Sequence, residues 1–147
     1  MYKRILLAYD GSEAGQKAVL DCQDIAQLGQ SALFLIAVMP PPTAYVGFEA
    51  GVYQSSPEEL EQQRQKYDAI LADGLRRLAD SGHSANGEVV VGESVDAITQ
   101  FARKIEADLI VVGHKHLDGW AARWWRGSLS RSLIEYAHCS VLVVITP

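Results

Sequence analysis

Two short segments that contain glycine have residue types suited to contact with a phosphate group. Residues 113–116 read Gly-His-Lys-His after an apolar run, and residues 127–128 read Gly-Ser before a helical pattern. Glycine lets the backbone approach a ligand closely, and Gly-Ser at a helix start offers free N–H groups, a hydroxyl and the positive end of the helix dipole. These segments indicate a phosphate site, although Gly113 can also simply end a strand and Ser128 can simply cap a helix.

Basic and histidine side chains surround these segments. Lys115, Arg123 and Arg126 could neutralise phosphate charge, although basic residues of a loop are usually solvated. His114 and His116 form an H-x-H pair beside an aspartate, but no further clustered ligand completes a metal site. The pattern therefore favours an anion over a metal ion.

The composition bounds the class of protein. The chain has 147 residues, of which 48% are hydrophobic and 21% charged, which suits one domain over residues 1–147. A net charge of -5 without a basic run argues against nucleic-acid binding. No apolar stretch approaches the length of a membrane span or of a signal peptide's core, so we expect a cytoplasmic protein. Cys22 and Cys139 have the apolar surroundings of small core residues.

Five short apolar runs alternate with helical patterns along the chain. The runs are residues 5–9, 32–38, 88–91, 109–112 and 141–145. Continuous Val, Ile and Leu runs of this length are typical of strands buried on both faces, as in a parallel sheet. We therefore predict an α/β fold with one open five-stranded parallel sheet and helices on both faces, a Rossmann-like architecture.

Helix signals separate these runs. Ser12 and Ser94 stand where N-caps are expected, and Gly29 stands where the first helix would stop. Ser56 and Pro57 give the strongest start, because two glutamates follow them in the first turn. The stretch before Ser56, after the prolines that follow the second strand, is predicted to be a loop.

The predicted topology places two of these residues together. Five strands joined by right-handed crossovers commonly adopt the order 3-2-1-4-5, with the switch point between strands 1 and 4. Ligands of such sheets bind outside the carboxyl ends of the strands at that point. Asp10, at the end of strand 1, and Gly113, which we predict to end strand 4, should therefore meet there. Asp10 also has a structural explanation, since Asp before Gly is a common turn residue.

The sequence resembles the universal stress protein family over its whole length. The resemblance rests on residues 3–12, 107–113, 127–128 and 138–144 taken together. It implies a nucleotide-binding α/β fold, usually dimeric, in which many members bind ATP or AMP and others bind none. Most members act as regulators without robust turnover.

The ATP-binding branch of that family carries Gly, two residues, Gly, nine residues and then Gly-Ser or Gly-Thr. Gly113 matches the first glycine, and Gly127 with Ser128 matches the last pair one residue late. His116 stands in place of the second glycine, so its ring would crowd a triphosphate. This version also resembles the branch that is thought not to bind ATP.

The resemblance also implies roles for single residues. Asp10 would lie near the ribose or a bound Mg²⁺, Ala8, Tyr9 and Val38 would line the adenine site, and Ser128 and Leu129 would meet the phosphates. The predicted nucleotide-binding residues are Ala8, Tyr9, Asp10, Ser12, Val38, Val112, Gly113, His114, Lys115, His116, Arg126, Gly127, Ser128 and Leu129.

Three functions remain open at this stage. The first is a regulator that binds ATP or AMP; the second is a nucleotide-independent dimeric interaction protein whose pocket His116 partly blocks. The third is a slow ATPase, which has the least support because no nucleophile with an adjacent base stands out, so we predict no catalytic residues.

We expect a homodimer through residues 141–145, an apolar run at the sheet edge. Trp120, Trp124 and Trp125 could form a lid, a patch for an unidentified protein partner, or a contact with the long helix.

Overall fold

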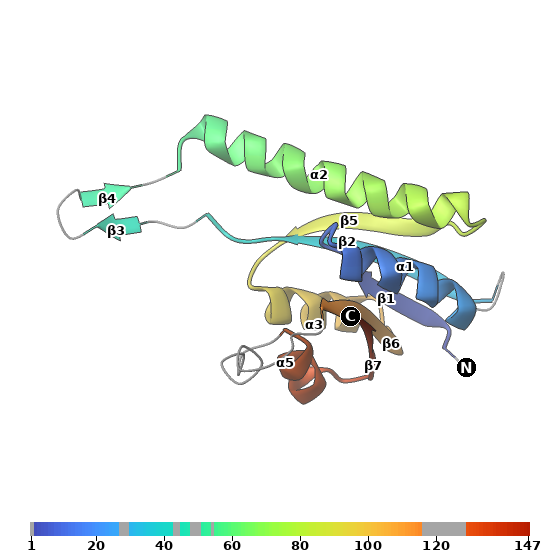
Figure 1. Ribbon diagram of the computed structural model, residues 1–147. Helices are drawn as coiled ribbons and strands as arrows, with labels where there is room; N and C mark the ends of the chain where they lie inside the picture. Colours follow the sequence, from blue (N-terminus) through green and yellow to red (C-terminus); the bar gives the residue numbers. More distant parts are fainter. Residues whose placement is uncertain (1, 27–29, 43–44, 48–50, 54, 116–128) are drawn as a thin grey trace.

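Five parallel strands form the central sheet of the computed structural model (Figure 1), which describes residues 2–26, 30–42, 45–47, 51–53, 55–115 and 129–147. The strands are β1 (Arg4–Ala8), β2 (Ala32–Met39), β5 (Ala85–Val91), β6 (Leu109–Lys115) and β7 (Ser140–Thr146). Their order is β5-β2-β1-β6-β7, and every pairing within this sheet is parallel. The predicted order 3-2-1-4-5 is thereby confirmed, with the switch point between β1 and β6.

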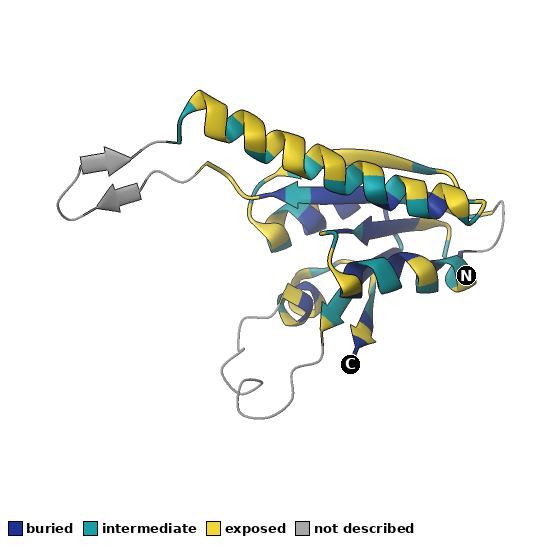
Figure 2. Cartoon of the chain, turned by 45° about the horizontal axis from the view of Figure 1, so that its top comes forward, coloured by how far each residue is buried: buried dark blue, intermediate teal, exposed yellow. Residues whose placement is uncertain are grey.

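Helices cover both faces of the sheet (Figures 1 and 2). Helices α1 (Glu13–Ile25) and α2 (Pro57–Asp80) pack on one face, and α3 (Ser94–Lys104) and α5 (Leu129–Tyr136) pack on the other. Successive strand residues point to opposite faces, so Leu7 joins the core under α1 and α2 while Leu6 joins the core under α3 and α5. This explains why β1 is apolar at every interior position.

Local sequence fixes where the helices begin. The Ser12 hydroxyl accepts a hydrogen bond from the Gly15 N–H at 3.1 Å, and Ser56 forms a capping box with Glu59 at the start of α2. The prediction for α3 was wrong by one residue, because the N-cap is Glu93, whose carboxylate accepts from the Asp96 N–H at 3.1 Å. Ser94 is the first residue of the helix.

Strand β6 is longer than predicted, so the prediction that Gly113 ends it was wrong. Gly113, His114 and Lys115 continue the pairing with β7, opposite Val144, Ile145 and Thr146. Apolar content falls after Val112, but the backbone ladder does not need apolar side chains.

A short hairpin lies in the predicted loop. Strands β3 (Tyr45–Gly47) and β4 (Gly51–Tyr53) pair antiparallel, outside the main sheet. Three residues per strand are too few to give a recognisable alternation.

The two cysteines belong to different cores. Cys22 is a buried residue of α1 in the core on one face of the sheet, and Cys139 packs against the core on the opposite face. The sheet therefore separates the thiols, in agreement with their interpretation as core residues. Within the described parts of the chain, no helix has both the length and the apolar character that a membrane crossing requires.

Candidate functional site

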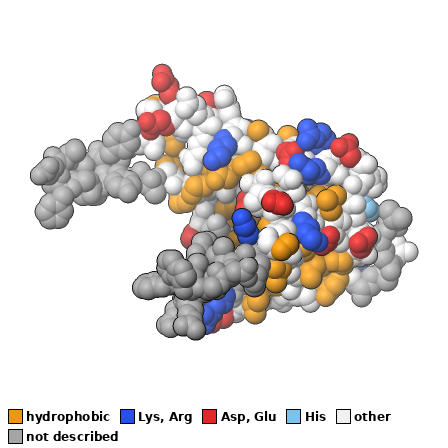
Figure 3. Space-filling model, in the orientation of Figure 1, with side chains coloured by type: hydrophobic (Ala, Val, Ile, Leu, Met, Phe, Trp, Pro, Cys, Tyr) orange, Lys and Arg blue, Asp and Glu red, His pale blue; other side chains and the backbone are white. Residues whose placement is uncertain are grey.

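A hollow of about 350 Å³ opens at the carboxyl ends of β1, β2 and β6. In the space-filling view, hydrophobic side chains gather where the molecule is hollowed between its upper and lower parts (Figure 3). Ala8, Val38 and Val112 from the strands form an apolar base to the hollow, and Ile98 of α3 adds to it. Such a slot suits a flat, largely apolar group such as a nucleobase.

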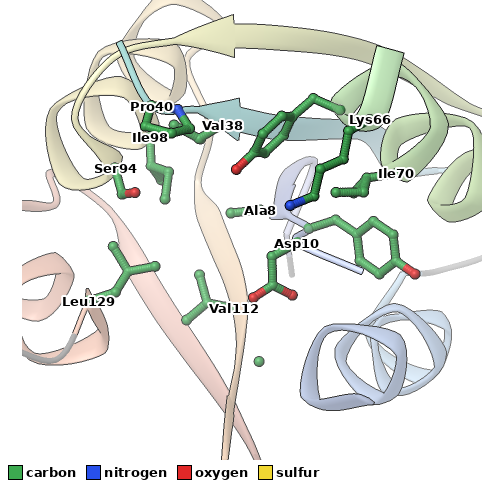
Figure 4. A pocket seen from close by; sticks show the side chains of 13 residues that line it. Ala8, Asp10, Val38, Pro40, Lys66, Ile70, Ser94, Ile98, Val112 and Leu129 are labelled. Carbon is green, nitrogen blue, oxygen red and sulfur yellow. The ribbon is translucent and has the colours of Figure 1, made fainter. Parts of the chain in front are cut away.

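Polar side chains enter the same hollow from three directions (Figure 4). Asp10 follows β1, Ser94 begins α3, and Lys66 and Tyr67 come from α2. The remaining lining residues are Tyr9, Pro40, Ile70, Gly113 and Leu129. The hollow thus combines an apolar slot with a few convergent polar groups, the usual composition of a small-molecule site.

A second hollow, of about 450 Å³, adjoins the first. Asp10, Gly113 and Leu129 line both of them. The second hollow also carries Ser12, Glu13, Ala14, His114, Lys115, Ser130 and Thr146. One elongated ligand could therefore pass Asp10 and occupy both spaces.

The structure brings ten of the predicted site residues to these two hollows. They are Ala8, Tyr9, Asp10, Ser12, Val38, Val112, Gly113, His114, Lys115 and Leu129. The other four, His116, Arg126, Gly127 and Ser128, lie outside the described residues, as do Arg123 and the three tryptophans. Among the residues that the structure does describe, no group of three His, Cys, Asp or Glu side chains is placed to hold a metal ion.

Asp10 lines the hollow, and one of its two carboxylate oxygens accepts hydrogen bonds within the turn after β1. Its Oδ1 accepts hydrogen bonds from the Ser12 N–H at 2.9 Å and from the Ser12 hydroxyl at 2.5 Å. No described residue donates to Oδ2. The structural and the functional interpretations of Asp10 are therefore compatible, because each uses a different oxygen.

The structure gives a reason for glycine at position 113 that we did not predict. A Cβ built on it would lie 2.2 Å from the Ala14 carbonyl oxygen and 2.6 Å from the Gly15 nitrogen. The backbone of the first turn of α1 thus packs directly on β6. This contact within the chain already requires glycine at position 113, while the approach of its backbone to a ligand stays a prediction.

Tyr9 connects the hollow to α2. The Tyr9 hydroxyl donates a hydrogen bond to Asp73, which also accepts from Arg77 Nε at 3.0 Å and from Arg76 at 2.7 Å. Burial, and then the hydrogen bond to Asp73, raise the pKa of Tyr9 from 10.0 to about 12. The hydrogen bond from Tyr9, followed by that from Arg77, lowers the pKa of Asp73.

This shift predicts an alkaline stability change. Because the pKa of Tyr9 is higher in the folded state, its contribution is present below pH 10 and is lost as the pH rises from 10 to about 12. We expect Tyr9→Phe to lower the free energy of unfolding at neutral pH by about 1 kcal/mol, because the hydrogen bond to Asp73 is lost. The variant should also lack the part of the alkaline decline in stability that the titration of Tyr9 causes. Urea unfolding between pH 7 and 11 measures both effects.

Tyr136→Phe is the matched control for this experiment, since that side chain is 64% exposed. It should behave as the unmodified protein at every pH. If the free energy of unfolding of Tyr9→Phe fell with rising pH as steeply as that of the unmodified protein, the assignment of this decline to Tyr9 would be contradicted.

Sequence reasoning missed six residues of the first hollow: Pro40, Lys66, Tyr67, Ile70, Ser94 and Ile98. Pro40 and Ser94 follow β2 and β5, whose carboxyl ends lie at the same sheet edge, so the rule applied to Asp10 could have found them. The three residues of α2 depend on how that helix crosses the sheet. No sequence signal specifies that crossing.

Comparisons with known proteins point to one family. The model of the universal stress protein family matches residues 1–144. A universal stress protein of Methanocaldococcus jannaschii is 30% identical over 149 residues, which cover 100% of this chain and 84% of that protein. One of Synechocystis sp. is 29% identical, with 97% of each chain covered.

Solved structures share the fold. A universal stress protein in complex with cAMP superposes with a TM-score of 0.73 at 23% identity, covering 99% of each chain. An Arabidopsis thaliana family member with AMP bound gives a TM-score of 0.67 at 16% identity, covering 99% of this chain and 92% of that one. At such identities the likeness establishes the fold, which is the one described above.

Proposed function

Because this chain belongs to the universal stress protein family, we propose that it is a regulator that binds an adenine nucleotide, ATP or AMP, beside β1 and β6. The observation that carries the proposal is the apolar slot closed on one side by Asp10, whose Oδ2 has no donor among the described residues. The AMP and cAMP complexes of proteins with this fold support the same class of ligand.

Each part of the nucleotide has a matching part of the two hollows. The base would lie in the slot of Ala8, Val38 and Val112. A ribose hydroxyl would donate to Asp10, and the 5′ phosphates would extend into the adjoining hollow toward Lys115. With a triphosphate, Asp10 would be the carboxylate that shares a Mg²⁺ with the phosphate oxygens, since Mg²⁺ is commonly held by one or two carboxylates and substrate phosphates.

The proposal is a regulator and not an enzyme. Among the described residues that line the two hollows, the carboxylates are Asp10 and Glu13, and Asp10 has one oxygen committed to the turn. The Asp10 carboxylate is held by Ser12 within its own turn, and Glu13 has no hydrogen-bond partner among the described residues, so neither is paired with a second group that would make it a base for water attack. Binding itself would then be the signal.

Calorimetry tests the proposal. Protein that has been purified and then denatured should release ATP, ADP or AMP, and the stripped protein should bind AMP or ATP-Mg with a dissociation constant below about 1 mM. Absence of released nucleotide, together with no binding at millimolar concentration, would contradict it.

The second candidate function is a nucleotide-independent interaction protein. His116, in the place of the family's second glycine, favours it. If crowding by this ring is what prevents binding, His116→Gly should gain affinity for ATP where the unmodified chain has none.

In both functions we propose a homodimer through β7, an edge strand whose Ile145 is 54% exposed. A monomeric mass in sedimentation at micromolar concentration would exclude that dimer.

A further inference from the structure

Lys66 brings a positive charge into the first hollow from outside the sheet. It lies on α2, one turn before Ile70, and both residues line the hollow because positions four apart share a helix face. Figure 4 shows its ammonium group directed into the space toward Asp10. No sequence pattern singled out this residue.

The charge of Lys66 is not compensated by the described residues. Its ammonium forms no ion pair with any carboxylate among them, and its one described polar contact is the Tyr67 ring, with Nζ 5.9 Å from the ring centroid. Arg76 and Arg77, two turns or more further along the same helix, both pair with Asp73. An uncompensated ammonium at a concave surface attracts an anion, in a protein whose net charge is -5.

Asp10 faces the same space with the opposite charge. The two groups come from different elements and do not pair with each other. A ligand that satisfies both must present a hydroxyl donor to Asp10 and an anionic acceptor to Lys66, with an apolar part in the slot. A ribose carries these features at adjacent atoms when one of its 2′ and 3′ oxygens is a hydroxyl and the other bears a phosphate.

We propose that Lys66 makes this hollow select nucleotides that carry a phosphate on the 2′ or 3′ oxygen of the ribose. The inference rests on the proposed function, because it takes the base and the ribose to lie as described there. It adds an anion subsite beside α2 in the first hollow, whereas Lys115 lines the second hollow. A 3′-monophosphate and a 3′,5′-cyclic phosphate both place an anionic phosphate on the 3′ oxygen beside a free 2′ hydroxyl. In the cyclic form the same phosphate is also esterified to the 5′ oxygen, so it carries one negative charge where the open form carries about two.

Calorimetry with four ligands tests the subsite: adenosine, adenosine 5′-monophosphate, adenosine 3′-monophosphate and 3′,5′-cyclic AMP. We expect Lys66→Gln to weaken binding of the 3′-monophosphate on the order of tenfold, and to leave adenosine within about twofold. Lys66→Arg should retain most of the affinity. Because Lys66 is exposed, these variants should fold as the unmodified chain does. Parallel loss for the cyclic nucleotide would identify it as a ligand of the same subsite, whereas its loss alone would assign the subsite to cyclic phosphates.

Arg64→Gln is the matched control, since it removes one positive charge from an exposed position of the same helix that does not line the hollow. It should leave all four affinities unchanged. Binding of adenosine with no effect of Lys66→Gln on either 3′-phosphate would overturn the inference and leave the proposed function standing. A gain of affinity in Lys66→Gln would do the same, and failure of all four ligands to bind the unmodified protein would overturn both.

Discussion

Gly113→Ala is expected to lower the free energy of unfolding by about 3 kcal/mol, the upper end of the usual range for overpacking. The added methyl carbon would lie 2.2 Å from the Ala14 carbonyl oxygen and 2.3 Å from its carbonyl carbon. Both atoms belong to the backbone of α1, so no side chain can rotate away to relieve the overlap. The helix must shift as a unit, and with it the turn that contains Asp10. Urea unfolding followed by circular dichroism measures the loss.

Gly82→Ala provides the control for this change. Gly82 has a φ of +81°, and apart from its two chain neighbours no described residue has a heavy atom within 4 Å of an added Cβ. The same substitution there introduces backbone strain without overlap and should cost about 1 kcal/mol. Losses of equal size at the two positions would mean that α1 can move away from β6 at little cost.

Asp10→Ala is expected to weaken binding of AMP on the order of thirtyfold, which corresponds to about 2 kcal/mol. The reason is that the variant removes the charged acceptor that a ribose hydroxyl would meet in the hollow. The Ser12 N–H also loses its partner, so a modest loss of stability accompanies the change. Calorimetry below the unfolding temperature separates the two effects.

Two comparisons make this prediction specific. Asp24→Ala removes an exposed carboxylate from α1, away from both hollows, and should leave AMP binding unchanged. An AMP analogue without the 2′ and 3′ hydroxyls should bind the unmodified protein weakly and lose nothing further in Asp10→Ala. If the analogue loses affinity as AMP does, Asp10 acts by holding the turn in shape and does not contact the ribose.

The sheet could be predicted from the sequence because its strands are buried on both faces. Leu6 and Leu7 serve opposite cores, so β1 has no polar interruption and stands out as a run. The order of the strands followed from general rules of handedness and connection. The extension of β6 to Lys115 could not be predicted, since it depends on backbone pairing with β7 at residues of mixed polarity.

The candidate site could be predicted where it depends on the sheet edge alone. Asp10 follows the end of β1, Val112 of β6 pairs with Ala8 at that end, and the structure places both Asp10 and Val112 at the first hollow. The reason for Gly113 could not be found from sequence, because the backbone of α1 that approaches it lies about a hundred residues earlier in the chain. Lys66 could not be predicted for the same kind of reason, because its position at the first hollow depends on how α2 crosses the sheet.

Helix α2 is longer than the sheet that supports it. Its 24 residues span about 36 Å, whereas the eight residues of β2 span about 26 Å. Its buried residues, Gly74 and Leu78, both lie in the second half, and Figure 2 shows the first half largely exposed. The residues that overhang the hollow can therefore change over evolution without disturbing the core. Related chains could acquire different ligand preferences on an unaltered scaffold by substitutions in this part of one helix.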